Sequence, residues 1–488
     1  MRVSYSGARQ RVLYDRAPVV VQNALTTAYG YRRRAATHRR FYREALESLR
    51  ETQWWDEERI IAARDARCSG FMRQAASLSP YWAEEFQKVG LPPDAAGVES
   101  LEMLPVLFKE RVCQNIDRIV SRPWATGVEK GVPVHTSGTT GTGLSFVASR
   151  ECAQWEFAFR DLHRSWGGYR PGDSVATIAG HPVVPIATMT PPFWRRNAAS
   201  NQTLFSSQHM TRATLPMYLE ELRRLKPALI HGFPSSLYIV ASFCLESGET
   251  GIRPKSVFTH SETLLDGHRE AIEQAFGCKV FDWYGTTEAA ANFVECEHGR
   301  MHIKHEYSLV EFLRTDGTHA AAGEYARVVG TAFGNLATPL IRYDTGDMAV
   351  LAADSCTCGR PGPIVERILG RQEDIFVTPD GRMVGILDHP FKDARNVVEA
   401  QLVQEQPSLV VVRLVRRERY SSADEAMLAE GLRLRLGALV RVVFEYVDHI
   451  PREANGKYRF AVSRVPLPGS LRQAADAEPR TADGGYCS

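Results

Sequence analysis

The sequence predicts an α/β protein with a large N-terminal body of layered α/β sheets and a small, mobile α+β domain at the C-terminus. Between about residues 131 and 351, short apolar strands alternate with helical segments and with turns rich in Gly, Pro and Ser. This alternation is typical of α/β layers. Beyond residue 370 the pattern changes to a hairpin, a strand, a helix and a further strand, which indicates a separate, smaller unit. The length of 488 residues suits roughly two to four domains.

The chain divides into four predicted regions. Residues 1–100 are expected to form a helical N-terminal region whose charged stretches lie on solvated helix faces. Residues 101–370 form the main body, in which the clearest elements are strands at 173–179 and 228–231 and helices at 214–225 and 265–276.

The third region is a predicted C-terminal lid domain at residues 371–468. It begins with a hairpin whose turn is Pro379-Asp380-Gly381. Strands are expected at 409–415 and 440–446, with a helix at 424–436 between them. Residues 469–488 have few apolar side chains and are predicted to be a flexible tail.

Composition excludes several classes of protein. Lys and Arg total 59 and Asp and Glu total 57, whereas dedicated nucleic-acid binders usually carry a strong basic excess. No apolar run approaches the ~20 residues that span a bilayer, and the N-terminus lacks the pattern of a signal peptide. Nine cysteines without framework spacing favour a reduced, cytoplasmic protein. We therefore expect neither a nucleic-acid nor a membrane partner.

The most informative motif is HTSGTTGTGLSF, at residues 135–146. Its hydroxyl residues are Thr136, Ser137, Thr139 and Thr140, and Gly138 and Gly141 let the backbone bend sharply between them. Successive amides in such a turn form an anion-binding concavity. Because strand-like residues flank the loop, we interpret it as a phosphate-binding loop rather than a plain connection.

Five motifs in order resemble the adenylate-forming superfamily of acyl-CoA synthetases, luciferases and peptide-synthetase adenylation domains. TSGTTG resembles the phosphate loop of that superfamily. The later motifs are the aromatic-Gly-x-Thr-Glu segment (residues 282–288), the Tyr-x-Thr-Gly-Asp segment (343–347), the hinge (370–374) and the C-terminal lysine motif (451–459). Lys226-Pro227, His231-Gly232-Phe233-Pro234 and Ser261-Glu262 further resemble the branch of phenylacetate-CoA ligases, coenzyme F390 synthetases and CapK-like proteins.

This resemblance implies ATP and Mg²⁺ as cofactors and a set of nucleotide-binding residues. Glu288 is the candidate Mg²⁺ ligand, Tyr284 offers a flat face to adenine, Asp347 can accept hydrogen bonds from the ribose hydroxyls, and Arg371 adds a contact on the ribose side. The complete predicted ATP/AMP set comprises Thr136, Ser137, Gly138, Thr139, Thr140, Gly141, Ser261, Glu262, Asp282, Trp283, Tyr284, Gly285, Thr286, Thr287, Asp347 and Arg371.

Lys457 and Glu288 are the predicted catalytic residues. Lys457 follows Asn455-Gly456, a strong turn signal, which places a long cation at a loop tip. We expect it to bridge the substrate carboxylate and the α-phosphate. Glu373 or Asp374 is the candidate hinge about which the small domain rotates.

The phosphate loop departs from the superfamily pattern in one respect. It continues as Thr142-Gly143-Leu144, where many members have Pro-Lys. Either another residue supplies the missing positive charge, or the loop closes less firmly on the phosphates.

A possible zinc ligand set lies outside these motifs. Cys296, His302, Cys356 and Cys358 would suit a tetrahedral structural zinc site. His298 and His305 compete as ligands, and unrelated buried thiols are the alternative interpretation. If zinc is bound, it joins the segment at residues 293–307 to the loop before the hinge.

The resemblance implies ATP-dependent activation of a small carboxylic acid as an acyl-adenylate, followed by acyl transfer to CoA. Transfer to an amine, a hydroxyl or a carrier-protein thiol remains an alternative, as does a nucleotide-binding module without catalysis. The sequence does not identify the acid, and it leaves the oligomeric state open, a homodimer being one option.

Overall fold

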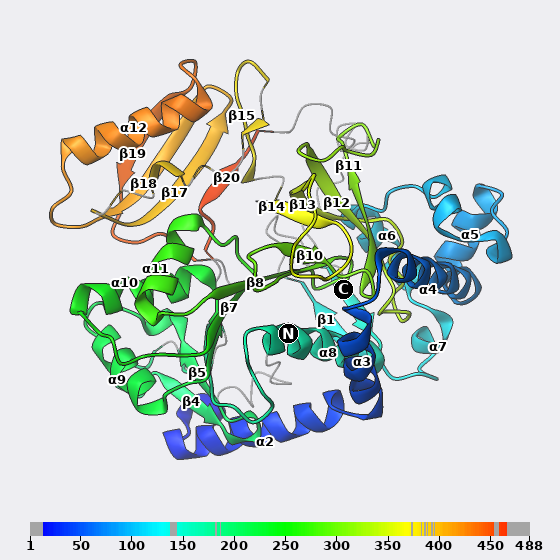
Figure 1. The fold of residues 1–488 in the computed structure, drawn as a ribbon, viewed down its shortest axis with the longest axis horizontal. Helices are drawn as coiled ribbons and strands as arrows, with labels where there is room; N and C mark the ends of the chain where they lie inside the picture. The colour runs from blue at the N-terminus through cyan, green and yellow to red at the C-terminus, as the bar shows by residue number, and fades with distance from the viewer. Residues whose placement is uncertain are drawn as a thin grey trace.

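The computed structural model describes residues 13–136, 144–180, 183–185, 187–371, 374–381, 383–384, 387, 389–391, 394, 396–452 and 458–465. Figure 1 shows a large body and a smaller C-terminal sheet that lies beside α10 and α11 at one end of the molecule. The predicted α/β class, with a small α+β unit at the C-terminus, is confirmed.

Helices make up most of residues 13–125, and so continue past residue 100, where the predicted helical region ends. They are α2 (Val19–Thr37), α3 (Arg40–Thr52), α4 (Glu57–Leu78), α5 (Pro80–Lys88), α6 (Lys109–Ile119) and α7 (Arg122–Ala125). Local capping explains two of the boundaries: the Asp56 carboxylate accepts from the Arg59 amide at the start of α4, and Ser79 precedes Pro80 at the first position of α5. Trp82 of α5 is fully buried and donates its indole N–H to the Pro339 carbonyl at 2.8 Å, which joins this region to the body.

The body is built on a twelve-stranded mixed sheet in the order β11-β12-β13-β14-β10-β9-β8-β7-β6-β3-β5-β4. Its strands are β3 (Val175–Ala179), β4 (Trp194–Asn197), β5 (Gln202–Ser206), β6 (Leu229–Gly232), β7 (Ser256–His260), β8 (Val280–Gly285), β9 (Asn292–Glu295), β10 (Met301–Ile303), β11 (Ser308–Leu313), β12 (Tyr325–Ala332), β13 (Tyr343–Leu351) and β14 (Ile364–Arg371). Strands β5, β3, β6, β7 and β8 are parallel neighbours. A separate hairpin pairs β1 (Val132–His135) with β2 (Ser145–Ala148).

Helices cover both faces of the parallel strands. On one face pack α9 (Leu215–Leu225), α10 (Pro234–Ser247) and α11 (Asp266–Phe276), whose apolar side chains share a core with Ile178, Ile230 and Val257. On the other face lies α8 (Arg150–Trp166), whose His163 ring lies 4.9 Å from that of Phe258. Open sheets of this kind bind ligands at the carboxyl ends of their parallel strands, where the segments after β7 and β8 lie.

The C-terminal unit has its own core. Its four-stranded sheet has the order β19-β18-β17-β20, formed by β17 (Val397–Gln406), β18 (Leu409–Arg416), β19 (Arg441–Tyr446) and β20 (Ala461–Ser463). Helix α12 (Ser422–Leu436) buries Leu428, Leu432 and Leu436 against this sheet. The predicted hairpin at Pro379-Asp380-Gly381 is confirmed as β15 (Phe376–Val377) paired with β16 (Met383–Val384).

The elements predicted in the body are also confirmed, at 173–179 and 228–231 as β3 and β6, and at 214–225 and 265–276 as α9 and α11. The four domain boundaries remain predictions, and the proposed tail at residues 469–488 lies outside the described residues. In the described part of the chain, no helix combines the length and the apolar character needed to cross a membrane.

Candidate active site and cysteine cluster

A cavity of about 820 Å³ lies between the body and the C-terminal unit. All the described residues predicted for the nucleotide site line it, together with the hinge candidate Asp374: Thr136, Ser261, Glu262, Asp282, Trp283, Tyr284, Gly285, Thr286, Thr287, Glu288, Asp347 and Arg371. The other predicted residues lie outside the described part of the chain: Ser137, Gly138, Thr139, Thr140, Gly141, Glu373 and Lys457.

Thr136 joins the two ends of the predicted phosphate loop. Its hydroxyl accepts a hydrogen bond from the Leu144 amide at 2.9 Å, and its own amide donates to the Leu144 carbonyl at 2.8 Å. These bonds continue the β1–β2 ladder by one step, because His135 pairs with Ser145. A hydroxyl that accepts one bond still has its hydrogen to donate, so Thr136 can close the loop and also contact a phosphate.

Tyr284 of β8, Asp347 of β13 and Arg371 of β14 form a connected group of side chains. The Tyr284 hydroxyl donates to Asp347 Oδ2 at 2.7 Å, and Arg371 Nε lies 3.0 Å from Asp347 Oδ1. The Tyr284 ring stacks on Phe293, with centroids 4.7 Å apart, so one of its faces is already covered. Because Asp347 has a donor on each oxygen, its orientation is fixed before any ligand is bound.

Glu288 is held by a residue of a distant strand. Its Oε1 accepts a hydrogen bond from the Tyr343 hydroxyl at 3.1 Å. Behind Tyr343, the Asp344 carboxylate pairs with Arg327 at 2.7 Å, and both side chains are buried. A carboxylate that lines the cavity and has a free lone-pair capacity fits the preference of Mg²⁺ for oxygen ligands.

Asp282 lies on β8 at the inner wall of the cavity. Burial raises the pKa of Asp282 to about 7, and the negative charge of Glu295 adds to the increase. The Thr259 hydroxyl donates to Asp282 Oδ1 at 2.6 Å and opposes the shift. Glu295 is itself paired with Arg269 at 2.9 Å. This carboxyl therefore changes its charge near neutral pH.

The segment after β7 connects the body to the C-terminal unit. Ser261 has a positive φ of 70°, and the Glu262 carboxylate accepts from the amides of Ser235 and Tyr458. Asp374 lies near the same boundary, where its carboxylate accepts from the Arg371 amide and pairs with Arg459.

Among the cavity residues that had no assigned role in the sequence interpretation, three polar side chains stand next to the predicted site. Lys109, the first residue of α6, brings a cation to the cavity, and Arg459 and Tyr343 also line it. The sequence contained one signal for Lys109: the phosphate loop lacks the usual lysine, and a cation from another residue was one of the two alternatives. No local pattern pointed to Tyr343 as the partner of Glu288.

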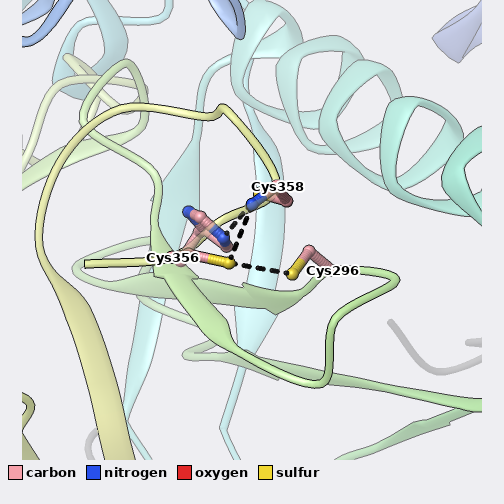
Figure 2. Close-up of side chains that lie close together, drawn as sticks. Cys296, Cys356 and Cys358 are labelled. Carbon is pink, nitrogen blue, oxygen red and sulfur yellow. Dashed lines mark hydrogen bonds between the residues drawn. The ribbon is translucent and has the colours of Figure 1, made fainter. Parts of the chain in front are cut away.

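The predicted cysteine cluster is assembled from two hairpin strands and a loop. Cys296 follows β9, His302 lies in β10, and Cys356 and Cys358 lie in the loop between β13 and β14. Figure 2 shows the sulfurs of Cys296 and Cys356 facing each other, 3.7 Å apart. The Cys358 sulfur lies 3.3 Å from His302 Nε2, and the four potential ligand atoms all lie within 4.8 Å of one another.

This geometry fits a tetrahedral metal ion. With Zn–S bonds of about 2.3 Å, two thiolates of a tetrahedral site lie about 3.8 Å apart, close to the 3.7 Å between Cys296 and Cys356. The amides of His298 and Cys358 donate hydrogen bonds to the sulfurs of Cys296 and Cys356. The competing histidines are not in this group: His298 Nδ1 lies 2.8 Å from the Thr357 hydroxyl, and neither His298 nor His305 is among the four clustered residues.

Comparisons with known proteins agree with this architecture. The family described as the CapK C-terminal domain matches residues 376–464. Protein CapK of Staphylococcus aureus is 25% identical over 462 residues, which cover 93% of this chain and 99% of that protein. The phenylacetate-coenzyme A ligase of Thermus thermophilus is 25% identical over 350 residues, which cover 69% of this chain and 74% of the ligase.

The fold also matches solved structures. A 2-hydroxyisobutyryl-CoA ligase in the postadenylation state, in complex with R3-HIB-AMP, superposes with a TM-score of 0.64 at 21% identity, covering 86% of this chain and 93% of the ligase. At this identity the likeness establishes the fold. The resemblance seen in the sequence is thus confirmed: the chain is similar to CapK over nearly its whole length, to phenylacetate-CoA ligases over about two thirds of it, and has the fold of the adenylate-forming superfamily.

Proposed function

We propose that the protein is an ATP-dependent ligase that converts a small carboxylic acid into an acyl-adenylate and then transfers the acyl group to CoA. One observation carries this proposal. Residues of separate motifs, at Thr136, in the segment 282–288, at Asp347 and at Arg371, line one cavity at the boundary with the C-terminal unit. A chance set of motif matches would have no reason to converge in space.

The residues of the cavity suggest how the nucleotide is held. The second face of Tyr284 would stack on adenine, and Asp347, oriented by Tyr284 and Arg371, would accept hydrogen bonds from the ribose hydroxyls. The loop that begins at Thr136 would bind the β- and γ-phosphates through hydroxyls and amides. Lys109 would add the positive charge that this loop lacks.

In the first reaction, a carboxylate oxygen attacks the α-phosphorus, a P–O bond forms, and pyrophosphate leaves. Both reactants are anionic, so catalysis depends on positioning and on charge neutralisation. Lys457 precedes Tyr458, whose amide is anchored to Glu262 beside the cavity. We assign Lys457 the role of bridging the carboxylate and the α-phosphate. Mg²⁺ held by Glu288 would neutralise phosphate charge.

In the second reaction, a nucleophile attacks the acyl carbon and AMP leaves. CoA is our first choice of acceptor, and CoA ligases occur among the relatives. An amine, a hydroxyl or a carrier-protein thiol would use the same adenylate. The proposed hinge at Glu373 and Asp374 would let the C-terminal unit withdraw and expose the acyl carbon to the acceptor.

A pyrophosphate-release screen tests this function. The purified protein is incubated with ATP, Mg²⁺ and a panel of aliphatic, hydroxy and aryl acids, first without an acceptor, then with CoA, and then with hydroxylamine as a model amine. We expect acid-dependent pyrophosphate release, with AMP release stimulated by CoA. The variant K457A should lose at least a hundredfold in pyrophosphate exchange, in line with the loss of a transition-state charge contact.

Two results would contradict the proposal. ATP binding without exchange for any acid would indicate a nucleotide-binding module without catalysis. If the rate of pyrophosphate exchange in K457A stays within a few-fold of the parent rate, Lys457 has no role in the mechanism. AMP release that CoA does not stimulate would keep the adenylate and exclude CoA as the acceptor.

We also propose that Cys296, His302, Cys356 and Cys358 hold a structural zinc ion. The ion would join the β9–β10 hairpin to the loop before β14, the strand that ends at Arg371. Because Cys296 also lines the cavity, the metal would stabilise one of its walls and the approach to the hinge.

A further inference from the structure

The Glu262 carboxylate joins three distant parts of the chain. Its Oε2 accepts from the Ser235 amide in the first turn of α10 at 3.1 Å, and its Oε1 accepts from the Tyr458 amide at 2.8 Å. Tyr458 lies 196 positions further along the chain, immediately after the proposed catalytic lysine. One side chain of the body thus receives a backbone donor from the segment that carries Lys457.

The residues on both sides of this segment are fastened to the C-terminal sheet. Before it, Arg452 pairs with Glu399 of β17. After it, the Tyr458 hydroxyl donates to the Ala400 carbonyl, also in β17. Strand β20, which follows, is the edge strand of the C-terminal sheet and pairs with β17 (red in Figure 1). Tyr458 is therefore bound to the C-terminal sheet through its side chain and to Glu262 of the body through its amide.

We propose that Glu262 is a positioning residue that docks the lysine-bearing segment on the body for adenylate formation, rather than a nucleotide contact. This inference rests on the proposed function, because it assumes that Lys457 acts in the first reaction. When the C-terminal unit withdraws for acyl transfer, the bond between Glu262 and Tyr458 breaks, while the bond to Ser235 lies within the body and remains.

The chemistry of the site favours docking over ligand binding. Each carboxylate oxygen already has a backbone donor, and hydrogen bonds to a charged acceptor are stronger than neutral ones. The donor is the backbone amide of residue 458, so the bond does not depend on which side chain stands there. It forms only when this part of the chain lies against Glu262. Asp374 and Arg459 form a second contact close by, but both belong to the part of the chain at and after the hinge.

Hydrogen exchange of the Tyr458 amide tests docking without any substrate. We compare the parent, E262A and E262Q by mass spectrometry, using peptides in which Tyr458 is an internal residue. The matched control is E246A, because Glu246 pairs with Arg417 across the same boundary, away from the lysine segment. In E262A the exchange of this amide should accelerate about ten- to hundredfold. E262Q, which keeps one acceptor oxygen, should be intermediate, and E246A should match the parent.

Two further measurements separate docking from nucleotide binding. The Kd of ATP·Mg²⁺ should stay within about threefold of the parent in E262A, whereas the rate of pyrophosphate exchange, with the best acid of the panel, should fall about ten- to hundredfold. Unchanged exchange of the Tyr458 amide in E262A, or a loss of ATP affinity as large as the loss of rate, would overturn the inference. If no acid supports pyrophosphate exchange in the parent, the proposed function fails. Hydrogen exchange of the Tyr458 amide still decides in that case whether Glu262 docks the segment.

Discussion

The replacement of Asp282 by Asn should make the stability of the body less sensitive to pH. Burial raises the pKa of Asp282 from an ordinary value of 3.8 to about 7. In the folded state the carboxyl therefore holds its proton up to about neutral pH, whereas in the unfolded chain it is ionised above about pH 4. Asn resembles the protonated carboxyl in shape and has no charge, so it imitates the favoured folded form at every pH.

The sign follows from proton binding. Between pH 4 and pH 7 the folded state binds more protons at Asp282 than the unfolded state, so the free energy of unfolding falls as the pH rises. A difference of about three pKa units corresponds to about 4 kcal/mol in total, of which on the order of 2–3 kcal/mol is lost between pH 5 and pH 8. The variant D282N lacks this loss.

Urea unfolding at pH 5 and at pH 8, followed by tryptophan fluorescence, measures the difference. The unfolding free energy of D282N minus that of the parent should increase by about 2–3 kcal/mol between the two pH values. The control D354N changes an exposed carboxylate paired with Arg300 and should show no such increase. Parallel pH dependences for D282N and the parent would refute the assignment of a raised pKa to Asp282.

Three further predictions concern the cavity and the cysteine cluster. C356S should reduce the zinc content, measured by plasma emission spectrometry, to well under one ion per chain and lower the melting temperature, whereas C278S, outside the cluster, should leave the zinc content unchanged; equal zinc in both variants would contradict the site. K109A should raise the KM for ATP about tenfold with a smaller effect on kcat, because one cation near the phosphates is lost; an unchanged KM would exclude Lys109 from phosphate binding. Y284F removes the donor 2.7 Å from Asp347 and should weaken AMP binding about tenfold by calorimetry; an unchanged Kd would show that Asp347 does not need this donor.

Much of the site could be predicted from the sequence because its residues occur in short motifs with local structural meaning. Thr136 precedes a glycine-rich sequence between two strands, and the segment 282–288 runs from strand β8 into a turn at the carboxyl edge of the sheet. Four candidate zinc ligands could be named, with His298 and His305 as competitors, because few residue types bind zinc. In each case the residue types and their spacing along the chain are enough to predict the site residue.

The partners of these residues could not be predicted in the same way. Tyr343 reaches Glu288 because β13 and the turn after β8 meet at the cavity, and Lys109 reaches it because α6 begins beside β13. Nothing near Glu262 in the sequence indicates a bond to an amide at position 458. These contacts depend on how distant segments pack, which local patterns do not specify.

The sequence by itself determined the α/β class, the order of the adenylate-forming motifs and the candidate residues of the cysteine cluster, because helix and strand patterns and motif chemistry are properties of neighbouring residues. Only the tertiary structure decided that these motifs line one cavity, that burial moves the pKa of Asp282 towards neutrality, and that Glu262 receives the segment after Lys457. Desolvation and long-range hydrogen bonds arise only once the sheet is assembled and the C-terminal unit lies against it, so they are absent from any local reading of the chain.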